Sequence, residues 1–161
     1  MSAFVDYLVE HRHDVPVMGA LRRLFSGSGV TFTAAAAPHV LPFVDDDGDL
    51  DSYLLVAALA PDGPKHQTGQ SIAHACRAIV ASLPVGAETS SGASGGKVYE
   101  REFNALLDAP RTDLPRRLRH LVALCAQHRE PFDWDRLLAD LREWDAEDRH
   151  VQTRLAREMW M

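Results

Sequence analysis

The spacing of the apolar side chains constrains this chain more than any other feature, because they repeat at the period of an α-helix. The clearest stripe consists of Trp134, Leu137, Leu138, Leu141 and Trp144. At about 3.6 residues per turn, these positions share one helix face and can be buried together. Similar stripes recur along the chain, whereas no alternation of apolar and polar residues reaches strand length. We therefore predict an all-α fold of roughly eight to nine helices in a compact two-lobed bundle.

Cap residues and prolines locate several of the helices. Asp14 is a predicted N-cap, with Pro16 in the first turn of its helix. Asp51 is the predicted cap of a helix over residues 52–60, and Thr68 is the predicted start of the next. The other segments expected to be helical are residues 3–12, 34–44, 99–108, 113–127, 134–144 and 151–159.

One segment divides the chain. Residues 86–96, GAETSSGASGG, are rich in Gly and Ser and predict a flexible loop. The 161 residues fit one domain. We place an N-terminal lobe at about residues 1–85 and a C-terminal helical bundle at about residues 97–161.

The net charge of −6 conceals a basic segment. Residues 97–120 contain six basic and four acidic side chains, and 15 of the 17 cations in the chain are arginine. Arginine forms planar, bidentate contacts with phosphate, so a local patch of this kind favours a nucleic-acid partner. A GC-rich codon bias would produce the same arginine excess, and the overall negative charge argues against strong binding of free nucleic acid.

Two phosphate or metal signatures fail on inspection. The run SGASGGK at 91–97 resembles a phosphate-binding loop, but Ser91 stands where Gly is needed and Val98 where Ser or Thr is needed. The acidic run at 45–51 resembles a calcium loop, but apolar residues occupy its first and last ligand positions. We interpret that run as a solvated acidic loop leading into a helix.

No catalytic or metal site emerges from the reactive residues. Cys76 and Cys125 fall inside apolar stripes, and His74 points about 160° away from Cys76 on a helical wheel. With His128 they form two separate pairs, which is weak evidence for zinc, so two core thiols are the expected arrangement. No nucleophile-elbow motif is present. We therefore expect no catalytic residue, no metal and no cofactor.

The cysteine content and hydropathy favour a cytoplasmic location. Two cysteines cannot build a disulfide framework. We expect no secretory leader, because Asp6 and Glu10 interrupt the N-terminal segment, and no run approaches the ~20 apolar residues of a membrane span.

The remaining candidates for function are arginines on the outward faces of the predicted helices. Arg116, Arg119 and His120 lie opposite the apolar stripe of their helix, and Arg117 lies on its flank. Solvent-exposed arginines are common on helical proteins, so each alone is weak evidence. The strongest group is the set of five within 19 residues: Arg101, Arg111, Arg116, Arg117 and Arg119. A second stripe, His150, Arg154 and Arg157, ranks lower because Glu158 lies one turn from Arg154.

Taken in order, the motifs resemble the small-subunit family (CasB) of the type I-E CRISPR Cascade complex. The segments that carry the resemblance are LRRLF at 21–25, TGQSIAHA at 68–75, R-x-F-x-x-L-L from Arg101, L-R-x-L from Leu118, and DW-x-x-L-L-x-x-L-x-x-W from Asp133. The likeness is thin over residues 26–60 and absent over 86–96. The acidic net charge also departs from the family's basic tendency.

This resemblance implies a non-catalytic, all-helical subunit of a crRNA-guided surveillance complex, usually present as a pair, whose basic surface stabilises the R-loop. The implied partners are crRNA, the target and displaced DNA strands, other Cascade subunits and a second copy of the chain, without a membrane or a small-molecule substrate. The arginines that match basic positions of the family's motifs are Arg23, Arg101, Arg111 and Arg119. The nearby arginines that we add are Arg22, Arg77, Arg116 and Arg117.

The sequence is also compatible with two other functions. A helical protein–protein adaptor would have an exposed apolar groove, with arginines scattered over all faces. A small metal-dependent enzyme would contain bound zinc. A nucleic-acid subunit would instead gather its outward arginines into one continuous track.

Overall fold

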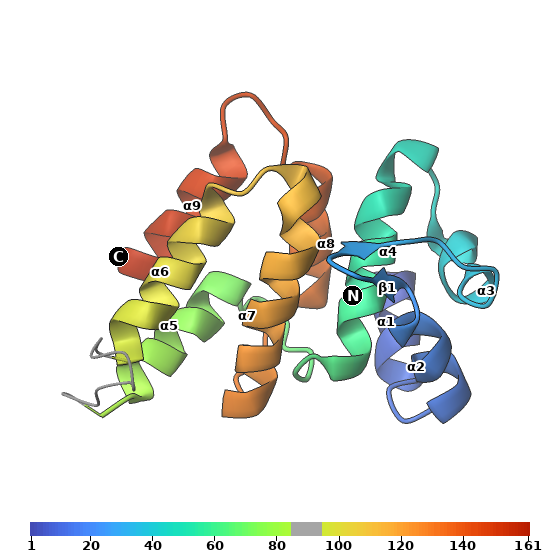
Figure 1. Cartoon of the computed structure of the whole chain (residues 1–161), viewed down its shortest axis with the longest axis horizontal. Helices are drawn as coiled ribbons and strands as arrows, with labels where there is room; N and C mark the ends of the chain where they lie inside the picture. Colours follow the sequence, from blue (N-terminus) through green and yellow to red (C-terminus); the bar gives the residue numbers. More distant parts are fainter. Residues whose placement is uncertain (85–94) are drawn as a thin grey trace.

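The computed structural model describes residues 1–84 and 95–161, and the regular secondary structure of this part of the chain is almost entirely helical (Figure 1). Its α-helices are α1 Ala3–Glu10, α2 Val15–Arg22, α3 Ala37–Val40, α4 Leu50–Leu59, α5 Ile72–Ser82, α6 Gly95–Leu107, α7 Leu114–His128, α8 Trp134–Arg142 and α9 His150–Trp160. Short 3₁₀ turns occupy η1 Leu41–Phe43, η2 Asp47–Asp49, η3 Ala60–Asp62 and η4 Arg111–Asp113. The predicted all-α class is confirmed.

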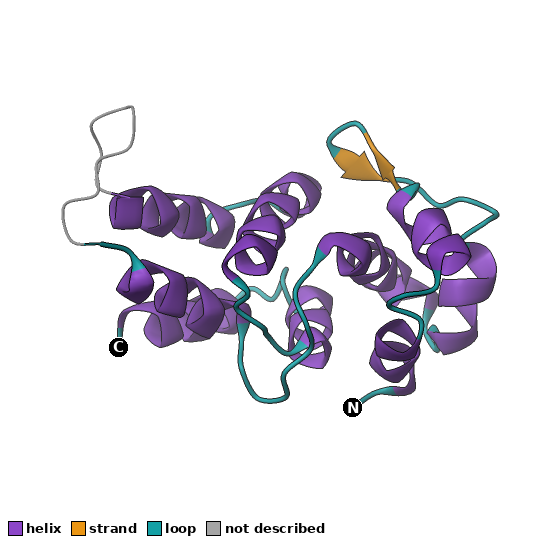
Figure 2. Ribbon diagram, turned by 90° about the horizontal axis from the view of Figure 1, so that it is seen from below, coloured by secondary structure: helices purple, strands orange, loops and turns teal. Residues whose placement is uncertain are grey.

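Two groups of helices flank a central group. Figure 1 shows α4, α7 and α8 in the middle, with α5, α6 and α9 on one side and α1, α2 and α3 on the other. Figure 2, seen from below, shows the same separation of the two outer groups. A single hydrophobic cluster draws residues from all of these helices.

Burial follows the predicted stripes. On α8, Trp134, Leu137, Leu138 and Leu141 are buried, and Trp144 is buried just beyond the helix end. Helix α4 is buried on nearly every face, which is why its sequence, LDSYLLVAAL, shows little amphipathic pattern. The expected core thiols, Cys76 and Cys125, are both free and buried.

Two predicted helix starts are wrong. The predicted Asp14 cap is confirmed, since its side chain accepts from the Val17 amide. Helix α4, however, begins at Leu50, which places Asp51 inside its first turn. Helix α5 begins at Ile72 behind Ser71, and Thr68 lies in a loop. The loop persists there because Gly69 has a φ of 84°, outside the helical region.

A short β-hairpin was missed. Strand β1 (Phe25–Ser26) pairs antiparallel with β2 (Gly29–Val30), and Gly27 in the turn has a φ of 62°. Strands of two residues are too short to display alternation, so periodicity could not have detected them.

Most of the predicted Gly/Ser loop at 86–96 lies outside the described residues. Its last two residues, Gly95 and Gly96, belong to α6, which therefore begins earlier than the predicted residue 99. The division of the chain into two lobes stays a prediction. Among the described residues, no helix combines the length and apolar character needed to cross a bilayer.

Candidate nucleic-acid interface

Helix α7 presents arginines to solvent because its opposite face is committed to the core. Leu114, Leu118, Leu121 and Cys125 are buried on one side, and Arg119 is exposed on the other. Pro115 in the first turn fits the helix start, where its missing N–H costs nothing. The predicted outward direction of Arg119 is thus a direct result of the apolar stripe.

The β-hairpin converts this exposed face into a recess. A cavity of about 290 Å³ lies between the hairpin and α7; its lining residues are Phe25, Gly27, Ser28, Arg116, Arg119, His120 and Ala123, and we call it the hairpin pocket. No acidic residue lines it. The guanidinium carbon of Arg119 lies 4.4 Å from the centre of the Phe25 ring. This cation–π contact restrains the guanidinium before any ligand arrives.

Asp113 organises the two neighbouring arginines. Arg116 reaches both of its carboxylate oxygens at 3.1 Å, and Arg117 Nε lies 2.6 Å from Oδ2. Hydrogen bonds from Arg116 and Arg117 lower the pKa of Asp113. The three side chains together carry one net positive charge, and Arg116 is the most exposed of them.

A small adjoining cavity continues the recess past Arg119. It is lined by Phe25, Ala58, Leu59, Asp62, Arg119, Val122 and Ala123, and we call it the middle pocket. Asp62 is its acidic residue, and Arg22 Nε pairs with that carboxylate at 3.1 Å. Arg22, one of the predicted arginines, therefore offsets the negative charge beside Arg119.

Arg111 has internal partners. Its Nη1 donates to the Leu141 carbonyl at 2.7 Å and lies 3.3 Å from Asp145, and its Nη2 donates to Ser52 Oγ at 2.7 Å. These bonds join the η4 turn to α4 and α8. A phosphate would compete with them for the guanidinium, and a role of Arg111 in nucleic-acid binding stays a prediction.

The remaining predicted arginines lie away from these pockets. Arg23 follows α2, Arg77 lies on α5 and Arg101 lies on α6; all three are exposed, and none pairs with a carboxylate of residues 1–84 or 95–161. None of them lines the cavities beside α7. Their roles also stay predictions.

Sequence reasoning missed three cations at the far end of α7. Arg12, Lys65 and Arg129 line another cavity there, of about 510 Å³. Arg12 and Lys65 belong to segments distant from α7 in the sequence, so helical spacing could not relate them to Arg129. The one local signal was Arg129 itself, directly after the last residue of the helix.

The potential metal ligands have other partners. Cys76 and Cys125 face each other in the core, where their hydrogen bond and burial raise the pKa of Cys76. His74 instead contacts Ser71, and His128 contacts the Tyr99 hydroxyl. The sequence-derived set therefore does not converge on one point.

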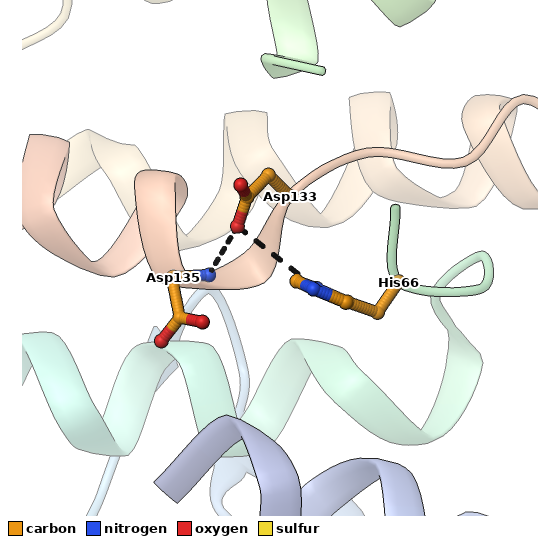
Figure 3. Close-up of side chains that lie close together, drawn as sticks. All are labelled: His66, Asp133 and Asp135. Atoms are coloured by element: carbon orange, nitrogen blue, oxygen red, sulfur yellow. Dashed lines mark hydrogen bonds and ion pairs between the residues drawn. The ribbon is translucent and has the colours of Figure 1, made fainter. Parts of the chain in front are cut away.

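In the described part of the chain, one group does bring three possible ligands together: His66, Asp133 and Asp135 (Figure 3). Backbone amides already use these atoms. Asp133 accepts from the amides of Asp135, Arg136 and Gly69, and His66 Nδ1 accepts from the Trp134 amide. Asp135 accepts from the Ser2 amide. The geometry is that of an N-cap that also joins α8 to the loop before α5.

Comparison with known proteins identifies related sequences and folds. The family model described as CRISPR-associated protein Cse2 matches residues 17–160. A curated CRISPR-associated protein Cse2 from Thermus thermophilus is 35% identical over 151 residues, covering 88% of this chain and 79% of the relative. A crystal structure of a Cse2-family protein from the same organism aligns over 99% of both chains, with 32% identity and a TM-score of 0.77. A chain of a CRISPR RNA-guided surveillance complex shares the fold, with a TM-score of 0.73 and 20% identity over 98% of this chain and 89% of that one.

Proposed function

The chain belongs to the CRISPR-associated protein Cse2 family, and from this premise we propose that it is the non-catalytic small subunit of a type I-E CRISPR Cascade complex. It binds nucleic-acid backbone without sequence specificity and stabilises the crRNA–target R-loop in antiviral defence. Its partners are crRNA, the target and displaced DNA strands, other Cascade subunits and a second copy of itself. The single observation that carries this proposal is the acid-free hairpin pocket, with Arg119 held over Phe25.

The pocket is suited to bind phosphate. Arg119 offers planar N–H donors that match phosphate oxygens, and Arg116 adds a second guanidinium beside it. Contacts to phosphate position a strand without selecting its sequence, as a subunit that must accept any guide requires.

The acidic net charge is compatible with this role. A chain with a net charge of −6 repels free nucleic acid at long range, so its intrinsic affinity is low. Within an assembly, neighbouring subunits hold the strand close and raise its effective concentration at the pocket. Binding thus becomes strong where the R-loop forms.

The proposal is tested in a reconstituted complex by measuring R-loop lifetime against salt concentration. Arg119→Gln keeps a polar side chain and removes the charge and the guanidinium. Arg142→Gln, on α8, removes the same charge from a residue that pairs with Asp49 and lies outside the predicted sites. We expect Arg119→Gln to shorten the lifetime and to lower the salt slope by about 0.7–0.9, the value of one phosphate contact. Equal lifetimes for wild type, Arg119→Gln and Arg142→Gln would show that the hairpin pocket does not contact the R-loop.

A second function, a helical protein–protein adaptor, is favoured by an apolar groove on the other side of the hairpin. This cavity of about 440 Å³ has a lining that includes Val30, Leu54, Leu55, Leu114, Pro115 and Leu141. Thr112, an exposed residue at its rim, provides the test. An adaptor without nucleic-acid contact would lose assembly in Thr112→Arg and behave as wild type in Arg119→Gln.

A further inference from the structure

The lining of the cavity at the far end of α7 is suited to bind an anion. Its lining residues are Arg12, Gly63, Pro64, Lys65, Ala126, Arg129 and Pro131, and we call it the linker pocket. Three of the seven are cations and none is acidic. Lys65 and Arg129 are exposed, and neither pairs with a carboxylate in the described parts of the chain. Their charges are available to a ligand.

Arg12 forms the rigid wall of the linker pocket. Its Nη1 and Nη2 donate to the carbonyls of Pro64 and Gly63, both at 2.9 Å. Gly63 and Pro64 are themselves buried. Because a guanidinium has five N–H donors, two bonds fix its position and still leave donors for a phosphate.

Arg129 adopts a backbone conformation that is energetically unfavourable for arginine. It follows the last residue of α7 with φ 59° and ψ 30°, the left-handed conformation in which glycine is the usual residue. A side chain there costs roughly 1–2 kcal/mol. Strain of this kind gathers at functional sites, and here it places a guanidinium beside Lys65.

The two basic pockets lie on the same face of α7. At about 100° per residue, Arg116, Arg119, Ala123 and Ala126 fall within about 80° of one another. The rise from Arg116 to Arg129 is about 20 Å at about 1.5 Å per residue. Figure 1 shows the hairpin beside the first half of α7 and the segment after α4 beside its second half.

The surface of α7 between the hairpin pocket and the linker pocket has small side chains that would not keep a polyanion from lying along the helix. Ala123 borders both the hairpin and middle pockets, and Ala126 borders the linker pocket, so small side chains line the helix between the cations. The acidic residue of the middle pocket, Asp62, is paired with Arg22. A polyanion lying along α7 therefore meets no unpaired carboxylate in these three cavities.

We propose that α7 carries one continuous track for a single nucleic-acid strand, and that the two ends of this track contact phosphates of the strand. The contacts at one end are Arg116 and Arg119 in the hairpin pocket, and those at the other end are Arg12, Lys65 and Arg129 in the linker pocket. The proposal rests on the proposed function and extends it to a strand type and a length. Both ends of the track are recessed, because the hairpin lines one pocket and residues 63–65 line the other, and a recess admits the backbone of a single strand more readily than a duplex. At the stacked-strand spacing of about 3.4 Å, a track of about 20 Å spans about six nucleotides.

The test is fluorescence anisotropy of labelled single-stranded oligonucleotides with the full-length chain at low salt. Arg129→Gly removes the cation and suits the left-handed backbone, so the fold is retained. Arg149→Gly is the matched control, because Arg149 is also left-handed, with φ 51°, but bonds to Leu107 O and pairs with Asp108 instead. Lys65→Ala supplies an independent variant in the same pocket.

We expect Arg129→Gly and Lys65→Ala to weaken binding of oligonucleotides of about six nucleotides by up to roughly fivefold each, the upper end for an exposed ion pair. Oligomers half that length should be less affected, and Arg149→Gly should bind as wild type. If only Arg119→Gln weakens binding, the linker pocket is not part of the track and the proposed function survives. If Arg119→Gln also binds and stabilises R-loops as wild type does, both proposals fail.

Discussion

Gly63 and Trp134 approach so closely that a Cβ atom on Gly63 would lie 2.4 Å from Cζ2 of the Trp134 ring. The indole N–H donates to the Pro64 carbonyl at 3.3 Å, and the same carbonyl accepts from Arg12. This contact therefore links the first residue of α8, a buried part of the core, to the wall of the linker pocket.

Gly63→Ala should destabilise the protein by about 1–3 kcal/mol, the usual cost of overpacking. The added methyl group meets a buried ring that cannot move aside. Gly29→Ala is the control, since no atom lies within 4 Å of the Cβ it would add. Urea denaturation measures both. Identical midpoints for the two variants would contradict the packing account.

Arg111→Ala should lower the free energy of unfolding by about 1–3 kcal/mol, because it leaves the Leu141 carbonyl and Ser52 hydroxyl without their partner. Arg101→Ala removes an equally charged but exposed side chain and should change stability by less than about 0.5 kcal/mol. Thermal unfolding compares the two variants. If Arg111→Ala proved as stable as Arg101→Ala, the internal bonds of Arg111 would contribute nothing measurable.

Asp133→Ala should cost about 1–2 kcal/mol through loss of the α8 cap. The stability of the wild type should be the same with and without a chelator, because backbone amides occupy the acceptor atoms of Asp133, Asp135 and His66. Differential scanning fluorimetry with zinc, manganese or chelator tests this. A midpoint that rises with added metal would identify the cluster as a metal site instead.

Asp140 should make the protein more stable in mild acid. Burial raises the pKa of its carboxyl to about 6, despite the ion pair with Arg154. Because the folded-state pKa exceeds the unfolded value near 4, the group's favourable contribution is complete below pH ~4 and is lost as the pH rises through ~6. The contribution amounts to about 3 kcal/mol at most.

The measurement is the free energy of unfolding of wild type and Asp140→Asn between pH 4 and pH 7. Asn cannot titrate, so the difference between the proteins isolates this carboxyl. The wild type should gain stability relative to the variant as the pH falls. A constant difference across the range would rule out the raised pKa of Asp140.

The local sequence pattern was sufficient to predict most of the helices. The α8 stripe from Trp134 to Leu141 is buried as predicted, and Asp14 caps α2 as predicted. Both depend on residues within one or two turns of each other, so the sequence contains the information directly. Thr68 and Phe25 show the limit: the loop around Gly69 bonds to Asp133, and the hairpin is too short to show alternation.

By itself, the sequence determined the all-α class, the buried faces and the outward direction of Arg116 and Arg119, because helical period couples each residue to its near neighbours. Only the tertiary structure decided that Phe25 holds Arg119, that Arg111 bonds inside the protein, and that Arg12 and Lys65 meet Arg129. These relationships join segments far apart in the chain. They arise when whole helices bury their apolar faces against one another, and no local spacing records which surfaces then become neighbours.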